Sequence, residues 1–390
     1  MPFALYLLGL AVFAQGTSEF MLSGLVADIA ADLHVSVPAA GLLTSAFAAG
    51  MVIGAPVMAL LSLRLSRRGA LVAFLSVFVV VHVLGAVTAD FGVLLATRVA
   101  GALANAGFWA VALAAANAMV KPELRGRATS IVVSGVTVAC IAGVPAGALI
   151  GQFLGWRSAF WAVAVVSLPA LFAILRTIPG GRPASAETSA RKELRVLREP
   201  RLLVVLLLGA LVNGGTFGTF TYLATLFTTV GGLGVGWVPA LLALFGVGSF
   251  LGVTLGGRLA DVRPGLVLFG GSAALLLGWI LLAVTAANLV VAIALVFVLG
   301  VLSFGVGSTL IPRVFAVAPG APTLAGGLAT AAFNVGAVVG PWFGGLAIGT
   351  ALGYRGAPWV SAVLVALALA LAVATQRFPE RRRAKADATA

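Results

Sequence analysis

The chain contains one internal repeat, with an offset of 198 residues. Residues 154–161 read Leu-Gly-Trp-Arg-Ser-Ala-Phe-Trp, and residues 352–359 read Leu-Gly-Tyr-Arg-Gly-Ala-Pro-Trp. The same offset carries Phe47, Gly50 and Gly54 onto Phe245, Gly248 and Gly252. Because unrelated landmarks share one register, the sequence predicts two homologous halves.

Hydrophobic residues make up 61% of the 390 positions, whereas charged residues make up 9%. A water-soluble surface needs roughly a quarter charged residues, so most of this chain must face lipid. Apolar runs long enough to cross a membrane as helices, about 20 residues each, predict twelve spans. These lie near 5–25, 39–61, 70–87, 93–119, 128–154, 159–175, 202–227, 237–255, 265–286, 289–311, 324–348 and 358–375.

The predicted fold class is an all-α integral membrane protein, with twelve transmembrane helices in two pseudo-symmetric six-helix bundles. We assign residues 1–176 to the N-terminal bundle and 202–376 to the C-terminal bundle. A flexible cytoplasmic linker over 177–201 joins them, and a basic cytoplasmic tail covers 377–390. A duplicated set of six apolar segments is typical of secondary transporters, whose substrate site lies between the halves.

The distribution of basic residues predicts the orientation. If both termini are cytoplasmic, the outer loops keep only Arg157 and Arg355, and all other loop cations lie inside. Cationic loops resist translocation, so this asymmetry favours cytoplasmic termini. Arginine greatly outnumbers lysine, which fits a GC-rich bacterial genome, and we therefore expect a bacterial plasma membrane protein.

Several classes of function are disfavoured. With a single cysteine, Cys140, and two histidines, the sequence has no cluster of metal-site spacing and cannot form an intramolecular disulfide. None of its three lysines stands in a phosphate-binding loop. No nucleophile or acid–base pair is visible, so we expect neither an enzyme nor a bound cofactor. The net charge of +13 resides in the loops and does not indicate a nucleic acid partner.

Three ionisable residues remain well inside the predicted spans: Glu19, His82 and Arg98. A charge at mid-bilayer costs at least about 2.5 kcal/mol, so such groups normally face an interior cavity and serve a function. We hypothesise that Glu19 carries a proton and that Arg98 tunes it. Alternatively, Glu19 pairs with a neighbouring helix or sits in a wet cavity without titrating. For His82 we favour a packing role.

Uncharged polar and aromatic residues suggest a substrate site lined by the first, fourth and seventh spans. Gln15 lies one helical turn before Glu19, and Asn105 lies two turns after Arg98. Asn213 is the repeat counterpart of Gln15, with Phe217 and Phe220 on its face. This set would suit a moderately hydrophobic, neutral or zwitterionic molecule. The alternative is that the amides only join helices.

Several stretches carry a family resemblance across essentially the whole chain. Gly54-Ala-Pro56 through Arg64 resembles a loop motif of the major facilitator superfamily, and Gly257 to Asp261 resembles its second copy. Arg98-Val-Ala-Gly101 is similar to a fourth-span motif associated with proton transfer. Within the superfamily, the chain resembles the twelve-span drug:proton antiporters. In the first loop copy, Ala59 and Leu63 replace the usual glycine and aspartate, which puts its charge relay in doubt.

The resemblance also assigns conformational residues. Gly143-Val-Pro145-Ala-Gly147 is similar to the antiporters' fifth-span motif. Glycines four apart allow close helix packing, and proline bends a helix, which suits a rocking seam. Gly143, Pro145, Gly147, Arg64 and Asp261 are thus expected to act in gating.

The opening segment from Phe13 to Gly24 looks especially like that of bacterial chloramphenicol-resistance exporters. The resemblance implies proton-coupled efflux of an amphiphilic antibiotic, chloramphenicol or a relative, by alternating access. The expected partners are the drug, protons and the lipid bilayer, and we expect a monomer. Export of a sugar or another metabolite is the alternative within transport. A passive facilitator or a lipid scramblase is the alternative from another class.

Overall fold

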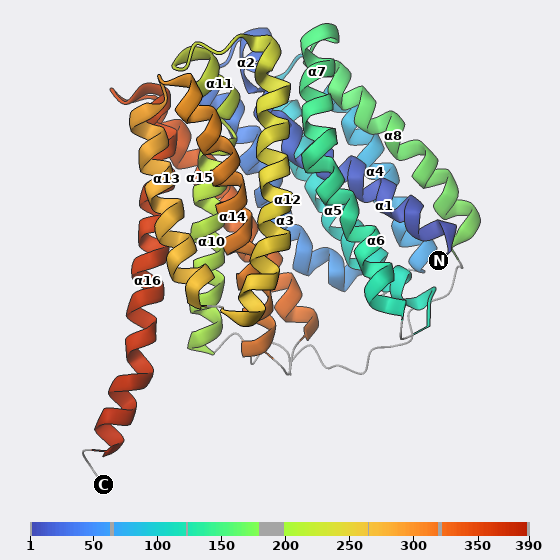
Figure 1. Cartoon of the computed structure of the whole chain (residues 1–390). Coiled ribbons are helices and arrows are strands. Elements are labelled where there is room, and N and C mark those ends of the chain that lie inside the picture. Colours follow the sequence, from blue (N-terminus) through green and yellow to red (C-terminus); the bar gives the residue numbers. More distant parts are fainter. Residues whose placement is uncertain are drawn as a thin grey trace.

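A computed structural model describes residues 2–62, 66–121, 124–178, 199–263, 265–318 and 322–387. Its described residues form helices joined by short turns (Figure 1). The first half contains α1 (Phe3–Phe20), η1 (Met21–Gly24), α2 (Val26–Asp32), α3 (Val37–Ser62), α4 (Arg67–Val87), α5 (Phe91–Ala118), α6 (Arg125–Val138), η3 (Ala139–Gly143), α7 (Val144–Leu154) and α8 (Trp156–Thr177). The second half contains α10 (Pro200–Phe220), α11 (Leu223–Thr229), η5 (Val235–Trp237), α12 (Val238–Val262), η6 (Leu266–Gly271), α13 (Ser272–Thr285), α14 (Leu289–Val317), α15 (Pro322–Ile348), η7 (Gly353–Arg355) and α16 (Gly356–Asp387).

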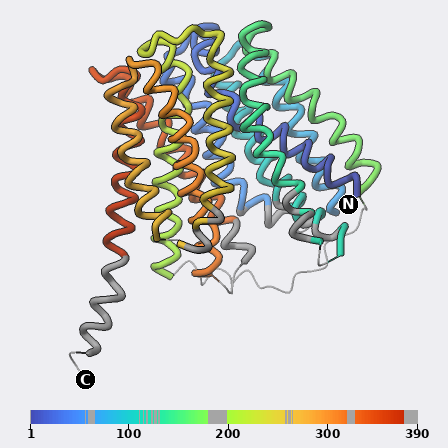
Figure 2. The backbone as a smooth tube through the Cα atoms, in the orientation of Figure 1, coloured from blue at the N-terminus to red at the C-terminus, as the bar shows by residue number. Residues whose placement is uncertain are grey.

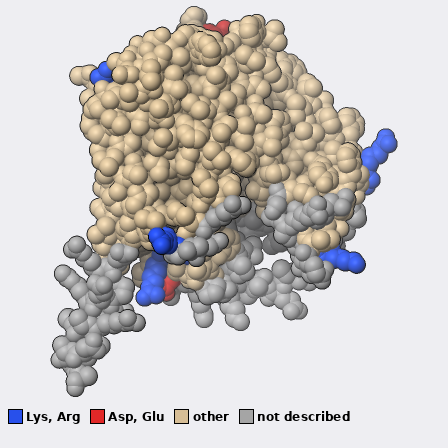
Figure 3. Space-filling view, in the orientation of Figure 1, with Lys and Arg blue, Asp and Glu red and all other residues tan. Residues whose placement is uncertain are grey.

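Within the described residues, twelve helical segments are long and apolar enough to cross a membrane, which confirms the predicted fold class. Charged side chains lie near the edges of the face in Figure 3, with a broad uncharged surface between them. Most of the predicted linker, 179–198, lies outside the described residues, as do 388–390 of the predicted tail. The rest of the tail continues the helix of α16 to Asp387.

Helix packing repeats between the halves, as the 198-residue offset predicts. In the first half α3 packs on α5 and α1 on α6, and in the second half α12 packs on α14 and α10 on α15. Gly50 explains the first contact, because a Cβ at this position would lie 2.7 Å from the Cβ of Ala102. Its counterpart Gly248 faces the backbone of α14 in the same way. The repeated glycines thus allow two equivalent close helix crossings.

Two large hydrophobic clusters form the core. One contains residues from Leu5 to Ile178, and the other contains residues from Leu208 to Ala372 together with Ala48, Val144 and Ala148. Figure 2 shows the two sets of helices side by side, the first mostly blue to green and the second mostly yellow to red. The three first-half residues in the second cluster mark where the halves meet.

The first predicted span, near 5–25, and the seventh, near 202–227, each contain an interruption of the helix that the sequence analysis did not anticipate. α1 ends at Phe20 and passes through the 3₁₀ turn η1 into α2. At the repeat-related place, α10 ends at Phe220, and α11 starts at Leu223 after a two-residue turn. The apolar pattern continues through both interruptions, so hydrophobicity alone did not reveal them. Each interruption leaves helix-end carbonyl groups without their usual i+4 donors.

The two halves contact each other toward the end of the molecule that carries α2, η5 and η7, which we term the α2 end. There, α3 packs on α15, and α7 and η3 pack on α12. Ser45 Oγ donates a hydrogen bond to the Val338 carbonyl at 3.0 Å, and Gln152 Nε2 donates one to the Val235 carbonyl at 2.7 Å. The contacts of the described residues therefore close this end.

Candidate transport site

Glu19 occupies the last turn of α1, directly before the interruption. Its side chain is partly exposed. Among the described residues, no group donates a hydrogen bond to its carboxylate, and no basic nitrogen lies within 4.0 Å of it. Among these residues, Glu19 thus shows no ion pair with a neighbouring helix.

Arg98 lies on α5 and is 2% exposed. Its Nη1 donates to Ser18 Oγ at 2.8 Å, and its Nη2 donates to the Ser18 carbonyl at 2.9 Å. The guanidinium carbon sits 4.4 Å from the centre of the Phe47 ring. The structure thus brings Arg98 to the residue next to Glu19, through contacts that the sequence did not indicate.

His82 joins the same cluster. Its Nδ1 bonds to the Phe78 carbonyl at 2.6 Å, and its Nε2 lies 2.6 Å from Ser18 Oγ. The ring also packs against Phe78 and Phe160. The expected packing contacts are therefore present, together with a polar contact to Ser18 that the sequence analysis missed. The sequence offered one signal for this cluster, because Ser18, His82 and Arg98 are polar or ionisable residues in three apolar helices.

A continuous set of aromatic contacts crosses between the halves. Phe20 stacks on Phe217 at 5.5 Å, Phe217 meets Phe220 edge to face at 6.0 Å, and Phe220 stacks on Phe245 at 4.6 Å. Phe245 then contacts Phe304 at 6.2 Å. These five rings, with Cys140, Val144 and Ser249, line a cavity of about 10 Å³, roughly the room one water needs.

The sequence predicted Phe217 and Phe220 in this cluster but missed Phe20, Phe245 and Phe304. Phe245 was already visible as the repeat counterpart of Phe47, whose ring contacts Arg98. Phe20 is adjacent to Glu19 in sequence. Phe20, which contacts the second half, therefore directly follows Glu19, which carries the carboxyl group in the membrane.

The three predicted amide residues do not line this cavity. Gln15 is fully buried, and neither polar atom of its amide has a partner among the described residues. Asn105 is also fully buried, with its Nδ2 atom 3.5 Å from the sulfur of Met51. Asn213 donates to the Phe333 carbonyl at 2.7 Å and so joins α10 to α15. Their role in substrate binding stays a prediction.

The predicted gating glycines face α1 near its interruption. Gly143 packs against Thr17, and a Cβ on Gly147 would lie 3.2 Å from that of Met21. Gly143 ends the π turn η3, and Pro145 lies in the first turn of α7. Arg64 lies outside the described residues, as does the side chain of Asp261 in α12. The gating roles stay predictions.

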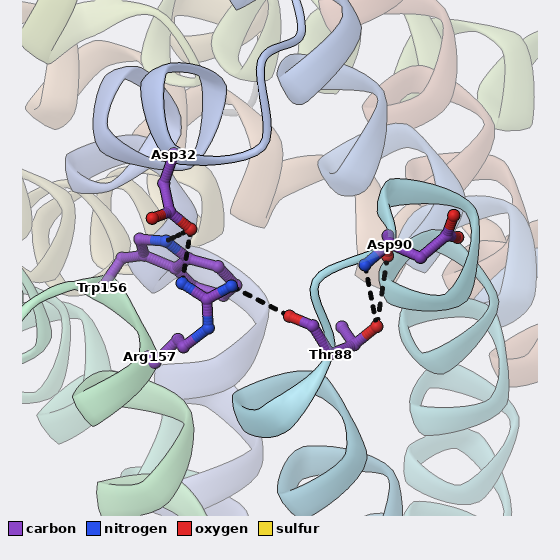
Figure 4. Close-up of polar contacts among 5 residues, drawn as sticks. All are labelled: Asp32, Thr88, Asp90, Trp156 and Arg157. Atoms are coloured by element: carbon purple, nitrogen blue, oxygen red, sulfur yellow. Dashed lines mark hydrogen bonds and ion pairs between the residues drawn. The ribbon is translucent and has the colours of Figure 1, made fainter.

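A second polar cluster lies at the α2 end, on the first half alone (Figure 4). Arg157 forms an ion pair with Asp32 and donates a hydrogen bond to the Thr88 carbonyl at 2.9 Å. Trp156 Nε1 donates to the same Asp32 carboxylate at 3.2 Å. The hydrogen bond from Arg157 holds the pKa of Asp32 below its ordinary range. This cluster ties α2 to α8 and to the turn before α5.

The arrangement contains no metal centre among the described residues, because these hold no group of three or more candidate ligands. What it does contain is a carboxyl group, a buried guanidinium and an aromatic cavity, placed where two repeat-related bundles meet. In chemical terms, the rings offer apolar contact surface, and the carboxyl group is ionisable.

Comparisons with known proteins show which family the chain belongs to. The family model of the Major Facilitator Superfamily matches residues 8–323. The chain is 53% identical to the chloramphenicol resistance protein of Streptomyces lividans over 396 residues, which cover all of both chains. It is 34% identical to the inner membrane transport protein YdhP of Escherichia coli (strain K12), over 96% of each chain.

Solved structures share the fold. A bacterial homolog to the human lysosomal transporter Spinster, in an inward-facing and occupied conformation, matches with a TM-score of 0.76 and 20% identity. The match covers 95% of this chain and 96% of that one. With the family model, the relatives and the twelve spans in agreement, the chain belongs to the major facilitator superfamily and is a multi-pass membrane transporter.

Proposed function

We propose that the protein exports an amphiphilic drug, chloramphenicol or a relative, in exchange for protons by alternating access. The full-length relative named for chloramphenicol resistance supports the substrate class. The observation that carries the coupling is the position of Glu19, a carboxyl group next to Phe20 that has no ion-pair partner among the described residues. A proton on Glu19 and a drug against Phe20 would each alter the surroundings of the other.

The energetics allow a single carboxyl group to drive the process. One proton that crosses about 100 mV releases roughly 2.3 kcal/mol. That free energy sustains about a fifty-fold gradient of a neutral drug. A stoichiometry of one proton per drug is therefore sufficient for resistance, and a second titrating group is not required.

We place the protein in a bacterial plasma membrane, as a monomer with both termini in the cytoplasm. The described basic side chains Arg67, Arg68 and Arg263 lie at the end opposite α2, consistent with the positive-inside rule. In that orientation the α2 end faces outward, and the contacts between the halves close the outer side. The aromatic cavity then opens toward the cytoplasm when the drug is loaded.

Glu19→Gln tests the proposal. We expect this variant to lose proton-driven chloramphenicol transport by purified protein in liposomes, because the amide cannot release a proton. Exchange of labelled for unlabelled chloramphenicol should persist, since the aromatic cavity is unchanged. A protonophore should abolish accumulation by the wild type.

Glu199→Gln is the matched control, because Glu199 precedes α10 at an exposed position outside the spans. It should transport as the wild type does. Undiminished proton-driven transport by the Glu19→Gln variant would reject the coupling role of Glu19. If chloramphenicol equilibrates across the membrane at a rate that depends neither on pH nor on the protonophore, the protein is instead a passive facilitator.

A further inference from the structure

The cluster of His82, Ser18 and Arg98 has a defined hydrogen-bond direction. The Phe78 carbonyl can only accept, so His82 Nδ1 carries the hydrogen of that bond. In a neutral imidazole the other ring nitrogen is then an acceptor, and Ser18 Oγ donates to it. A lone pair of Ser18 Oγ remains free to accept from Arg98, as observed. A neutral His82 is therefore consistent with the hydrogen bonds from His82 to Phe78, from Ser18 to His82 and from Arg98 to Ser18.

These hydrogen bonds fix the position of the Arg98 guanidinium. Both Nη atoms are engaged by Ser18, one through its hydroxyl and one through its backbone carbonyl. That carbonyl belongs to the last turn of α1, where a positive charge is favourable because helix-end carbonyls lack intrahelical donors. Arg98 thus sits beside Glu19 without pairing with its carboxylate.

We infer that Ser18 and His82 are positioning residues, which hold Arg98 off Glu19 and thereby keep the carboxyl group able to retain a proton. A cation that comes close to a carboxyl group favours its charged form. Release of Arg98 from Ser18 would bring that cation to Glu19 and expel the proton. The inference rests on the proposed function, because it assigns a control to the same proton site.

The packing around His82 shows which part of the side chain matters. Its ring lies between Phe78 of α4 and Phe160 of α8, at centroid distances of 4.1 and 5.9 Å. A Cβ added to Gly101 of α5 would lie 3.9 Å from Cε1 of His82. The charged groups that face the cluster are Arg98 from α5 and Glu19 from α1. A phenylalanine at position 82 would fill this apolar space equally well, so only the bond to Ser18 requires a histidine.

The decisive measurement is an infrared titration of the Glu19 carboxyl band in purified protein, with Glu19→Gln used to assign the band. We expect His82→Phe and Ser18→Ala to move its midpoint toward acid by about one pH unit. Ser18→Ala removes the acceptor of Arg98 Nη1, and His82→Phe leaves the Ser18 hydroxyl free to rotate away from it, so only the bond from Nη2 to the Ser18 carbonyl still holds the guanidinium. His82→Gln keeps an acceptor for Ser18 and should leave the midpoint near that of the wild type. The pH profile of chloramphenicol transport should shift in parallel, without a change in KM.

The outcomes separate this inference from the proposed function. A wild type that does not move chloramphenicol would refute the function, whereas the titration needs no drug and would still decide the role of His82. If His82→Phe does not fold, Ser18→Ala carries the test. Unchanged midpoints in the folded variants overturn the inference. So does an equal shift in His82→Phe and His82→Gln, since the hydrogen bond would then not be the cause.

Discussion

At the scale of single residues, the amide of Gln15 is a costly group in the first half. Both of its polar atoms are buried, and neither has a partner among the described residues. A buried polar group without a hydrogen bond costs about 1–3 kcal/mol. Asn213, its repeat counterpart, is in contrast bonded to the Phe333 carbonyl. The same position thus carries an unsatisfied amide in one half and a bonded amide in the other.

We therefore expect Gln15→Met to stabilise the protein by about 1 kcal/mol, because an apolar side chain of similar length removes the unsatisfied amide. If Gln15 contacts the drug, the same change should weaken chloramphenicol binding, so stability and affinity would move in opposite directions. Thermal unfolding in detergent and equilibrium binding measure the two effects. Asn213→Leu is the control and should destabilise. A lower melting temperature for Gln15→Met would show that another group satisfies the amide.

The ion pair between Asp32 and Arg157 should make stability depend on pH. Because the pKa of Asp32 is lowered on folding, its contribution is present above the ordinary pKa of aspartate, about 4, and is lost as pH falls through the lower folded value. Asp32→Asn should thus be less stable than the wild type at neutral pH and equal to it in acid. Melting curves at several pH values and salt concentrations measure this. A difference that stays constant in acid would contradict the assignment.

The residue scale also shows what the sequence can and cannot reveal. Glu19 and Arg98 were recognisable because ionisable side chains are rare in apolar spans. Their partners were not, since Ser18 is an ordinary helix residue by composition, and its backbone carbonyl becomes available only where α1 is interrupted. The partner of Arg157 was missed for a similar reason, because Asp32 lies 125 positions away in the chain.

At the scale of helices, the repeat offset predicted that packing would recur between the halves, whereas the interruptions of α1 and α10 were missed. Hydropathy records how apolar a segment is, and both interruptions consist of apolar or small residues. The interruption of α10 has a clear consequence. It directs Tyr222 toward the contact between the halves, where its ring lies against Gly41 of α3 in the first half. Its hydroxyl donates to the Pro341 carbonyl of α15, in its own half, at 2.9 Å.

Gly41→Ala should therefore oppose closure of the α2 end. The added Cβ would lie 2.6 Å from Cζ of Tyr222, a fully buried ring that cannot move aside. Such overpacking costs about 1–3 kcal/mol, enough to shift a two-state population by roughly five- to 150-fold. Distances between spin labels on α2 and η5 should lengthen. Gly236→Ala, which meets no atom within 4 Å, is the control. Unchanged distances would refute the role of this contact.

At the scale of the whole molecule, the two halves are alike in packing and unlike in chemistry. Glu19, His82 and Arg98 all belong to the first half, whereas four of the five cavity rings belong to the second. Under the proposed function, the halves would divide the work, with proton exchange in one and most drug contacts in the other. Phe20 is the cavity ring that the first half supplies, so it joins the two functions.

The stack of Phe20 on Phe217 should consequently show coupling between the halves. Phe20→Ala and Phe217→Ala should each lower chloramphenicol affinity by about tenfold, because each removes an aromatic surface. The double variant should lose less than the product of the two, since the rings form one site. Binding isotherms for the four proteins give the coupling energy. Strictly multiplicative losses would place the two rings in separate sites.

The small size of the cavity has a further consequence for recognition. At about 10 Å³ it has room for roughly one water, so under the proposed function a chloramphenicol molecule must separate the rings before it can enter. In the empty transporter the cavity rings contact one another, so an incoming aryl group must replace one phenylalanine ring as the neighbour of another. Selectivity would then depend on how closely a ligand resembles a phenylalanine ring, rather than on a fixed cavity shape. Such a site would accept many flat, hydrophobic antibiotics rather than a single one.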